Sequence, residues 1–263
     1  MKIQNKIYLS IFCFIVIGML CAVFLPKEAK RNEAAVLRVG AGDDISGLLM
    51  KEVLKQVEGQ RKITAEEIEN SAFSDCCSNS AQWAMNAKEI NVAFYCSHIA
   101  KHTVENNKDV MIYAPVIMNS ELIVYQKDWK DIRELGVLQG RKQEQKLAKE
   151  TYPQIEKMHE ISQKGIAYSL EDGQIDGAIL DITKAVYFPS YSRKPLADRD
   201  YISYVLVVDK EFEKTEAFQE FIRAYNLAVE KLQDAKYLAK CMEADEKWVK
   251  DTTIKFLTLP ESE

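Results

Sequence analysis

Short apolar strands alternate with helices along this chain, and the alternation occurs in two groups. In the first group, a strand at 36–39 precedes a helix with apolar residues at helical spacing, and the buried strand "INVAFY" follows at 90–95. The second group has strands at 135–140 and 175–181 with helical stretches between them. Such alternation indicates parallel strands covered by helices, so the predicted fold class is α/β.

Long extended segments connect the two groups. "ELIVYQ" and "YISYVLVVD" are strand patterns, and the amphipathic helix at 214–234 follows the second of them. We expect its apolar residues in the core: Phe218, Phe221, Ile222, Tyr225, Leu227, Val229 and Leu232. Two α/β units joined by such crossovers predict two lobes with a cleft. Each lobe would be a mixed, mostly parallel sheet flanked by helices, with hinge strands between them.

Domain boundaries follow from this order. The predicted segments are a signal or membrane anchor with its tether at 1–35, the first part of lobe 1 at 36–118, lobe 2 with the crossover at 119–200, and the return to lobe 1 with C-terminal helices at 201–263.

The N-terminus carries an export pattern. Lys2 and Lys6 precede an uncharged apolar run at 7–25, which is about the 20 residues that a membrane-spanning helix needs. The basic residues favour a cytoplasmic N-terminus, which leaves the folded part on the extracytoplasmic face of the cell membrane. "GMLC" resembles a lipoprotein box, although Leu20 stands where a small residue is usual. Lipidation at Cys21 and an uncleaved anchor are the alternatives.

Net charge argues against one class of partner. The chain has 35 basic and 40 acidic side chains, for a formal charge of −5. Phosphate backbones require a basic surface, so no nucleic acid is expected to bind.

Polar side chains gather where the predicted strands end, and ligands of open α/β sheets bind at the carboxyl ends of strands. The candidate binding residues are Cys76, Cys77, Cys96, His98, Asp44, Ser78, Asn119, Arg141 and Asp181. Each polar candidate has a structural alternative. Asp44 and Asp181 are placed to cap helices, Asn119 to face water, and Arg141 to meet an anion or lie on a solvated helix face. Trp83 is expected in the core.

The cysteines allow three interpretations. Cys76 or Cys77 could bridge to Cys96 in a disulfide, since exported proteins carry them. The same three residues could be a thiolate site for a soft metal, with Cys77 close to a helix N-terminus. Apolar packing is the third interpretation, and for Cys241 it is preferred.

Several local patterns carry a resemblance to a known family. "SAQWAMNAKEINVAF", "LGVLQG", "YSLEDGQIDGAILD" and "DYISYVLVVDKEF" occur in that order. Together they resemble the type II substrate-binding proteins of bacterial ABC transporters, over roughly residues 36 to 240, in the branch of thiamine-precursor, nitrate and alkanesulfonate binders. The pair Cys76–Cys77 with "YCSH" further resembles the substrate-binding (seleno)protein SaoB subgroup.

The resemblance implies a membrane-tethered, monomeric binding protein that delivers a small ligand to an ABC transporter permease. For the SaoB subgroup the implied ligand is a soft-metal or organometal species, held by Cys76, Cys77 and Cys96. No cofactor and no catalysis are expected. The alternative is a thiol-dependent oxidoreductase or lyase on the same scaffold, with Cys77 as nucleophile, Cys96 as resolving thiol and His98 as base.

Overall fold

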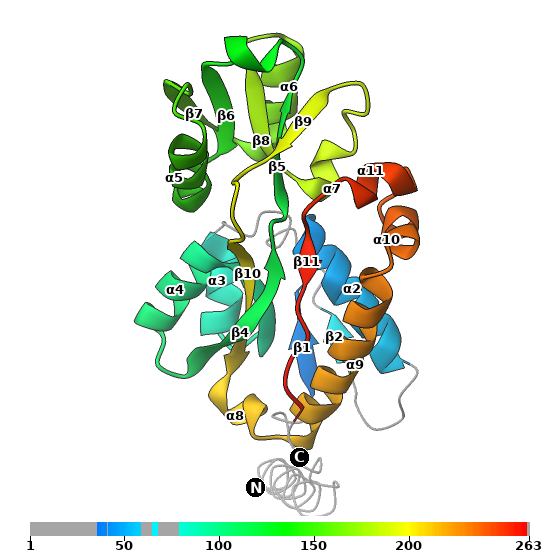
Figure 1. Ribbon diagram of the computed structural model, residues 1–263. Helices are drawn as coiled ribbons and strands as arrows, with labels where there is room; N and C mark the ends of the chain where they lie inside the picture. Colours follow the sequence, from blue (N-terminus) through cyan, green and yellow to red (C-terminus); the bar gives the residue numbers. More distant parts are fainter. Residues whose placement is uncertain (1–35, 41, 59–64, 68–78, 262–263) are drawn as a thin grey trace, which may run out of the picture. The chain divides into compact units, whose positions relative to one another are not determined.

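The computed structural model describes residues 36–40, 42–58, 65–67 and 79–261 (Figure 1). The anchor, the lipidation site at Cys21 and the candidates Cys76, Cys77 and Ser78 lie outside these residues. Among the helices that are described, none combines the length and apolar character needed to cross a membrane.

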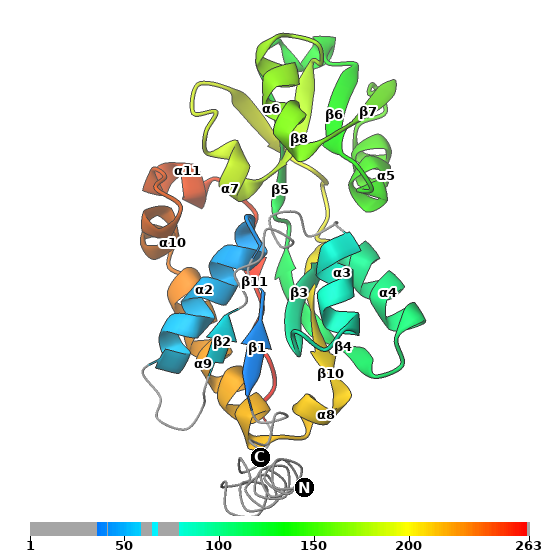
Figure 2. The ribbon, with the colours of Figure 1, turned by 180° about the vertical axis from the view of Figure 1, so that it is seen from behind.

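The first sheet contains six strands in the order β11-β4-β10-β3-β1-β2. Their bounds are β1 Leu37–Val39, β2 Ala65–Glu67, β3 Val92–Cys96, β4 Val110–Met118, β10 Ile202–Asp209 and β11 Lys255–Phe256. Strands β2, β1 and β3 are mutually parallel, whereas β10, β4 and β11 join by antiparallel pairing. Figures 1 and 2 show α2 and α9 on one flank of this sheet and α3 and α4 on the other.

The second sheet contains five strands in the order β7-β6-β8-β5-β9. Their bounds are β5 Glu121–Tyr125, β6 Glu134–Leu138, β7 Lys157–Ile161, β8 Gly177–Asp181 and β9 Ser192–Pro195. Strands β7, β6 and β8 are parallel, and β5 and β9 are antiparallel additions. The predicted α/β class with two mixed sheets is confirmed, with the parallel pairings confined to three strands in each sheet.

Helices follow the strands in the predicted order. Their bounds are α2 Ile45–Glu58, α3 Asn79–Asn86, α4 Ser97–Asn106, α5 Lys142–Thr151, α6 Gln163–Glu171, α7 Ile182–Ala185, α8 Lys210–Glu213, α9 Glu216–Leu232, α10 Ala235–Cys241 and α11 Glu246–Lys250, with a 3-10 turn η3 at Trp129–Asp131. Side-chain caps determine where several helices begin: the side chain of Thr215 caps α9, and that of Asp181 caps α7.

Helix α9 buries most of the apolar residues expected of it. Phe218, Phe221 and Tyr225 are fully buried. The ring of Phe221 contacts those of Phe218 and Tyr225, with ring centroids 5.9 Å and 6.3 Å apart. Leu227 is 46% exposed, so its assignment to the core is wrong, because it falls on the solvent side of the helical stripe. Trp83, also expected in the core, is 60% exposed on α3, whose inward face is formed by Ala84 and Met85.

Two crossovers join the sheets, between Met118 and Glu121 and between Pro195 and Ile202. Asn119 lies on the first crossover with a left-handed backbone (φ 59°). Its amide donates to Asp200 Oδ1 at 2.7 Å and to the Thr253 carbonyl at 3.0 Å, and its oxygen accepts from the Tyr201 amide at 3.0 Å. One side chain therefore ties together both crossovers and the C-terminal segment.

Candidate functional site

A cavity of about 700 Å³ lies at the carboxyl ends of strands from both sheets. Asp43 and Asp44 border it from the loop before α2, and the remaining lining comes from the second sheet and its helices. One wall is apolar and consists of Leu138, Ile166, Ala167, Leu180 and Phe188. A volume of this size is in the range of sites for small molecules.

Asp44 is held in place by the helix that it caps. Its Oδ1 accepts hydrogen bonds from the Ser46 amide at 3.0 Å, the Ser46 hydroxyl at 2.6 Å and the Gly47 amide at 3.1 Å. Its Oδ2 accepts from the Tyr204 hydroxyl at 3.0 Å. The predicted capping role and a place at the cavity are therefore compatible, because the two carboxylate oxygens are used differently.

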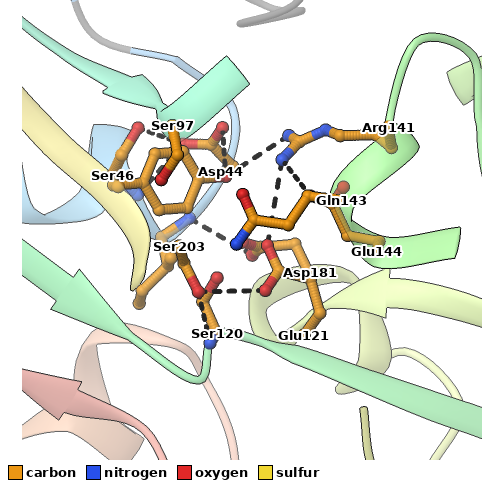
Figure 3. A network of polar contacts seen from close by, with 12 residues as sticks. Asp44, Ser46, Ser97, Ser120, Glu121, Arg141, Gln143, Glu144, Asp181 and Ser203 are labelled. Atoms are coloured by element: carbon orange, nitrogen blue, oxygen red, sulfur yellow. Dashed lines mark hydrogen bonds and ion pairs between the residues drawn. The ribbon is translucent and has the colours of Figure 1, made fainter. Parts of the chain in front are cut away.

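Arg141 is the residue that precedes α5, and its side chain extends into the site. Its Nη1 donates to Glu144 Oε1 at 3.0 Å and lies 3.8 Å from Glu121 Oε1. Its Nη2 lies 3.5 Å from the Tyr204 hydroxyl, and the guanidinium lies 5.9 Å from the centre of that ring. Figure 3 shows Arg141 extended toward Asp44, with Glu121 and Asp181 nearby. Because carboxylates already surround the guanidinium, its positive charge is largely neutralised and attracts an anionic ligand less strongly.

Asp181 ends β8 and is 8% exposed. Its Oδ1 accepts from the Thr183 amide at 2.9 Å, the Thr183 hydroxyl at 2.6 Å and the Ile45 amide at 3.2 Å. Its Oδ2 is buried and, within the described part of the chain, accepts no hydrogen bond. Burial, and after it the nearby charge of Asp44, raises the pKa of Asp181 to about 7.

Glu121, the first residue of β5, is a second buried acid. Its Oε2 accepts from the Tyr201 hydroxyl at 2.9 Å and the Ser203 hydroxyl at 3.0 Å. Burial, and after it the charge of Glu144, raises the pKa of Glu121 to about 7, although Arg141 acts in the opposite direction. The cluster thus contains two carboxyl groups, Asp181 and Glu121, that stay protonated until the pH approaches 7.

Contacts between the two sheets' elements close one side of the cavity. The Ile45 amide at the start of α2 donates to Asp181 of the second sheet. Lys184 of α7 pairs with Asp43 at 2.6 Å, and the Gln143 side chain of α5 donates to the carbonyl of Ile202 at the start of β10. Both lobes therefore contribute bonding groups to the same site.

The predicted site residues fall into three groups. Asp44, Arg141 and Asp181 meet around the cavity. Cys96 ends β3, is 3% exposed, and is the cross-strand partner of Tyr204. His98 is exposed in the first turn of α4, and Asn119 is engaged at the crossover, so neither borders the cavity. Cys76, Cys77 and Ser78 lie outside the described residues.

Sequence reasoning missed four members of the cluster: Glu121, Glu144, Tyr201 and Tyr204. The sequence patterns place Glu121 and Tyr204 only in strands, and Glu144 only in one of the helical stretches between 140 and 175. A glutamate at the start of an otherwise apolar strand was the available signal, because burying a carboxylate there is costly without polar partners. No metal-binding group of three or more His, Cys, Asp and Glu side chains occurs among the residues with defined positions.

Comparison by sequence finds no relative: no protein-family model matches the chain, and no curated protein matches it. Comparison of structures does. The ligand-binding component of an ABC-type import system from Staphylococcus aureus, solved with zinc bound, has a TM-score of 0.63 at 14% identity, over 85% of this chain and 86% of that one.

Two further solved structures have the same arrangement. The alkanesulfonate-binding protein SsuA from Xanthomonas axonopodis pv. citri, bound to MOPS, has a TM-score of 0.57 at 17% identity, over 86% of this chain and 87% of that one. An ABC transporter protein from Parabacteroides distasonis has a TM-score of 0.63 at 13% identity, over 85% and 86%. The chain therefore has the two-lobed type II periplasmic-binding-protein fold, which it shares with these solved structures.

Proposed function

We propose that this protein is the solute-binding component of an ABC transporter and captures a small ligand between its two lobes. The observation that carries the proposal is the cavity of about 700 Å³ bordered by groups from both sheets, with the polar cluster of Asp44, Arg141 and Asp181 at its edge. In a fold whose lobes meet at a hinge, a ligand that contacts both lobes stabilises their closed arrangement. A permease can then distinguish the loaded from the empty protein.

The solved structures of similar fold support this role, because two of them contain a bound small ligand. The Staphylococcus aureus protein has zinc bound, and the Xanthomonas axonopodis protein has MOPS bound. Those ligands differ in charge and size, so the fold alone does not select one. The role that we propose is therefore binding without turnover, on the extracytoplasmic face of the membrane, with the chain monomeric and tethered by its N-terminal segment or by lipid at Cys21.

A thiolate contribution to the ligand site is part of the proposal. Cys96 follows Tyr95 at the carboxyl end of β3, and its cross-strand partner Tyr204 donates to Asp44. Cys96 is therefore close in the sheet to the polar cluster. Together with Cys76 and Cys77, it would supply the soft sulfur ligands that the resemblance to the SaoB subgroup implies, for a soft-metal or organometal species.

Filling the cavity tests the binding role. Ala167 lies on α6 in the apolar wall, and Ala167→Trp should occupy the space that a ligand needs. We expect the full chain, purified in mild detergent, to show ligand-induced rises in Tm against a broad panel of small solutes and soft metals. The Ala167→Trp variant should lose them. Lys149→Trp, on the exposed side of α5, is the matched control and should keep them.

Cysteine variants test the thiolate part separately. Cys76→Ser, Cys77→Ser and Cys96→Ser should each weaken the response to soft metals. If all three leave every metal response intact, the thiolate site is refuted while the binding role stands. Chemical conversion of a bound ligand over many cycles would instead contradict the binding role and favour an enzyme.

A further inference from the structure

Acidic groups gather on one side of the cavity. Asp44 and Asp181 border the space directly, and Glu121 and Glu144 lie next to Arg141. Arg141 is the basic side chain within this cluster among the described residues, and its guanidinium already contacts Glu144 and Glu121. Elsewhere on the lining the charges are balanced, since Lys184 pairs with Asp43, and Lys164 and Glu171 add one charge of each sign. Once Asp181 and Glu121 are ionised, an entering ligand therefore meets an excess of negative charge.

The two carboxylate oxygens of Asp181 are used unequally. Asp181 Oδ1 accepts three hydrogen bonds, whereas Oδ2 is buried and accepts none among the described residues. An unsatisfied buried carboxylate oxygen costs about 1–3 kcal/mol or more in mutational series, so a site usually supplies a partner for it. A bound cation or charged N–H donor would be such a partner.

From this arrangement we infer that the ligand carries a positive charge on an apolar body, and that Asp181 Oδ2 receives the charge while the wall of Leu138, Ile166 and Phe188 contacts the body. The inference rests on the proposed binding role and names the ligand class. It also separates this chain from the sulfonate binders of the same fold, whose ligand is an anion. An organic ammonium and an organometal cation both present this chemistry.

Cation binding at Asp181 should also depend on pH. Asp181 faces Asp44 from the loop before α2, Arg141 from the start of α5 and Thr183 from α7, while Glu121 faces Glu144, Arg141 and Tyr201. Because these surroundings hold the protons of Asp181 and Glu121 up to about pH 7, a cation must displace a proton to bind at pH 6. As the pH increases toward 7, the affinity for the cation should therefore increase, by up to about tenfold per pH unit for each proton displaced.

A charge-matched series of phenyl compounds tests the inference on the full chain. Phenethylamine and phenylmercury(II) are cations from the two sources, phenethyl alcohol is neutral, and 3-phenylpropionate and 2-phenylethanesulfonate are anions. We expect at least one cation to bind, more tightly at pH 8 than at pH 6, with proton release measured by calorimetry in two buffers. If only phenylmercury(II) binds, and Cys96→Ser abolishes it, the source is organometal. Binding of phenethylamine identifies an organic cation.

Variants of Asp181 complete the test. Asp181→Asn should weaken cation binding by at least about tenfold while keeping the cap of α7. If that variant does not fold, Asp181→Ser offers a second cap without the charge. Glu230→Gln, an exposed acid on α9, is the matched charge control and should bind as the parent does. Anions that bind as tightly as the cations, or cations that bind unchanged to the Asp181 variants, would overturn the inference alone. If no compound of the series binds while a solute of the broad panel does, the inference fails and the proposed function stands. If no solute of either set binds, both fail.

Discussion

At the scale of single residues, the site is governed by carboxyl groups whose charge is costly. Asp181 and Glu121 are both buried, and the pKa of each is raised to about 7. In the unfolded chain both would ionise near pH 4. The folded state therefore holds protons that the unfolded state releases, and the free energy of unfolding should fall as pH rises from about 4 to about 7.

Substitution of Asp181 should remove its share of this pH dependence. With Asp181→Asn, the drop in the free energy of unfolding between pH 5 and pH 7.5 should shrink by about 1–3 kcal/mol, because the amide does not ionise. Urea denaturation of parent and variant at both pH values measures the difference. Glu230→Gln should leave the drop as it is. A variant with the same or a steeper drop than the parent would show that Asp181 is ionised in the fold.

Asn119 acts through its backbone as well as its amide. Asn119→Ala loses three hydrogen bonds and also places a Cβ-bearing residue without a polar side chain at φ 59°. We expect a loss of about 1–3 kcal/mol in the free energy of unfolding. Asn119→Gly loses the same bonds without the backbone strain and should be the less destabilised of the two. Equal stability of Asn119→Ala and the parent would refute the structural role at the crossover.

At the scale of elements, the start of α2 is built to approach the second lobe. Asp44 caps the helix, Ile45 donates its amide to Asp181, and the backbone of Gly42 packs against Gly47. A Cβ at Gly47 would overlap the Gly42 carbonyl, which is backbone and cannot rotate away. The loop and the helix therefore depend on a residue without a side chain at position 47.

Gly47→Ala should consequently destabilise the protein by about 1–3 kcal/mol despite the better helix propensity of alanine. Gly165 is the third residue of α6, as Gly47 is of α2, and its Cβ would meet only Ile161 and Ser162 side-chain atoms at 3.3 Å. Gly165→Ala should be neutral or slightly stabilising. Thermal denaturation of both variants gives the comparison, and equal Tm values for the two would contradict this packing.

Periodicity identified most helices and strands because they bury a regular apolar face. The buried strands β3 and β8 and the helix α9 are examples, each with a continuous or helical apolar pattern. Strands β7 and β9, with the sequences KMHEI and SRKP, were not predicted, since their burial is only partial and their residues are mainly polar or charged. Their strand conformation comes from pairing with β6 and β5.

At the scale of the whole molecule, the order of elements predicted two α/β units. Alternating strand and helix patterns, and the extended segments that connect the two groups, can both be recognised in a single sequence. The site was predictable only in part. Asp44, Arg141 and Asp181 follow strands or precede helices, so the rule on strand ends found them. Glu121 and Tyr204 lie within strands, and only the register of β5 and β10 brings their side chains to the cluster.

Capture of a small ligand between the lobes is tested most directly by hydrogen–deuterium exchange of the full chain, with and without the solute that raises Tm most. If the cavity is the binding site, the bound solute should slow exchange in the segments 42–47, 139–145 and 180–188, which border it from both lobes. Ala167→Trp should abolish this protection. Protection confined to one lobe or to segments away from the cavity, or retained in Ala167→Trp, would contradict capture in this cavity.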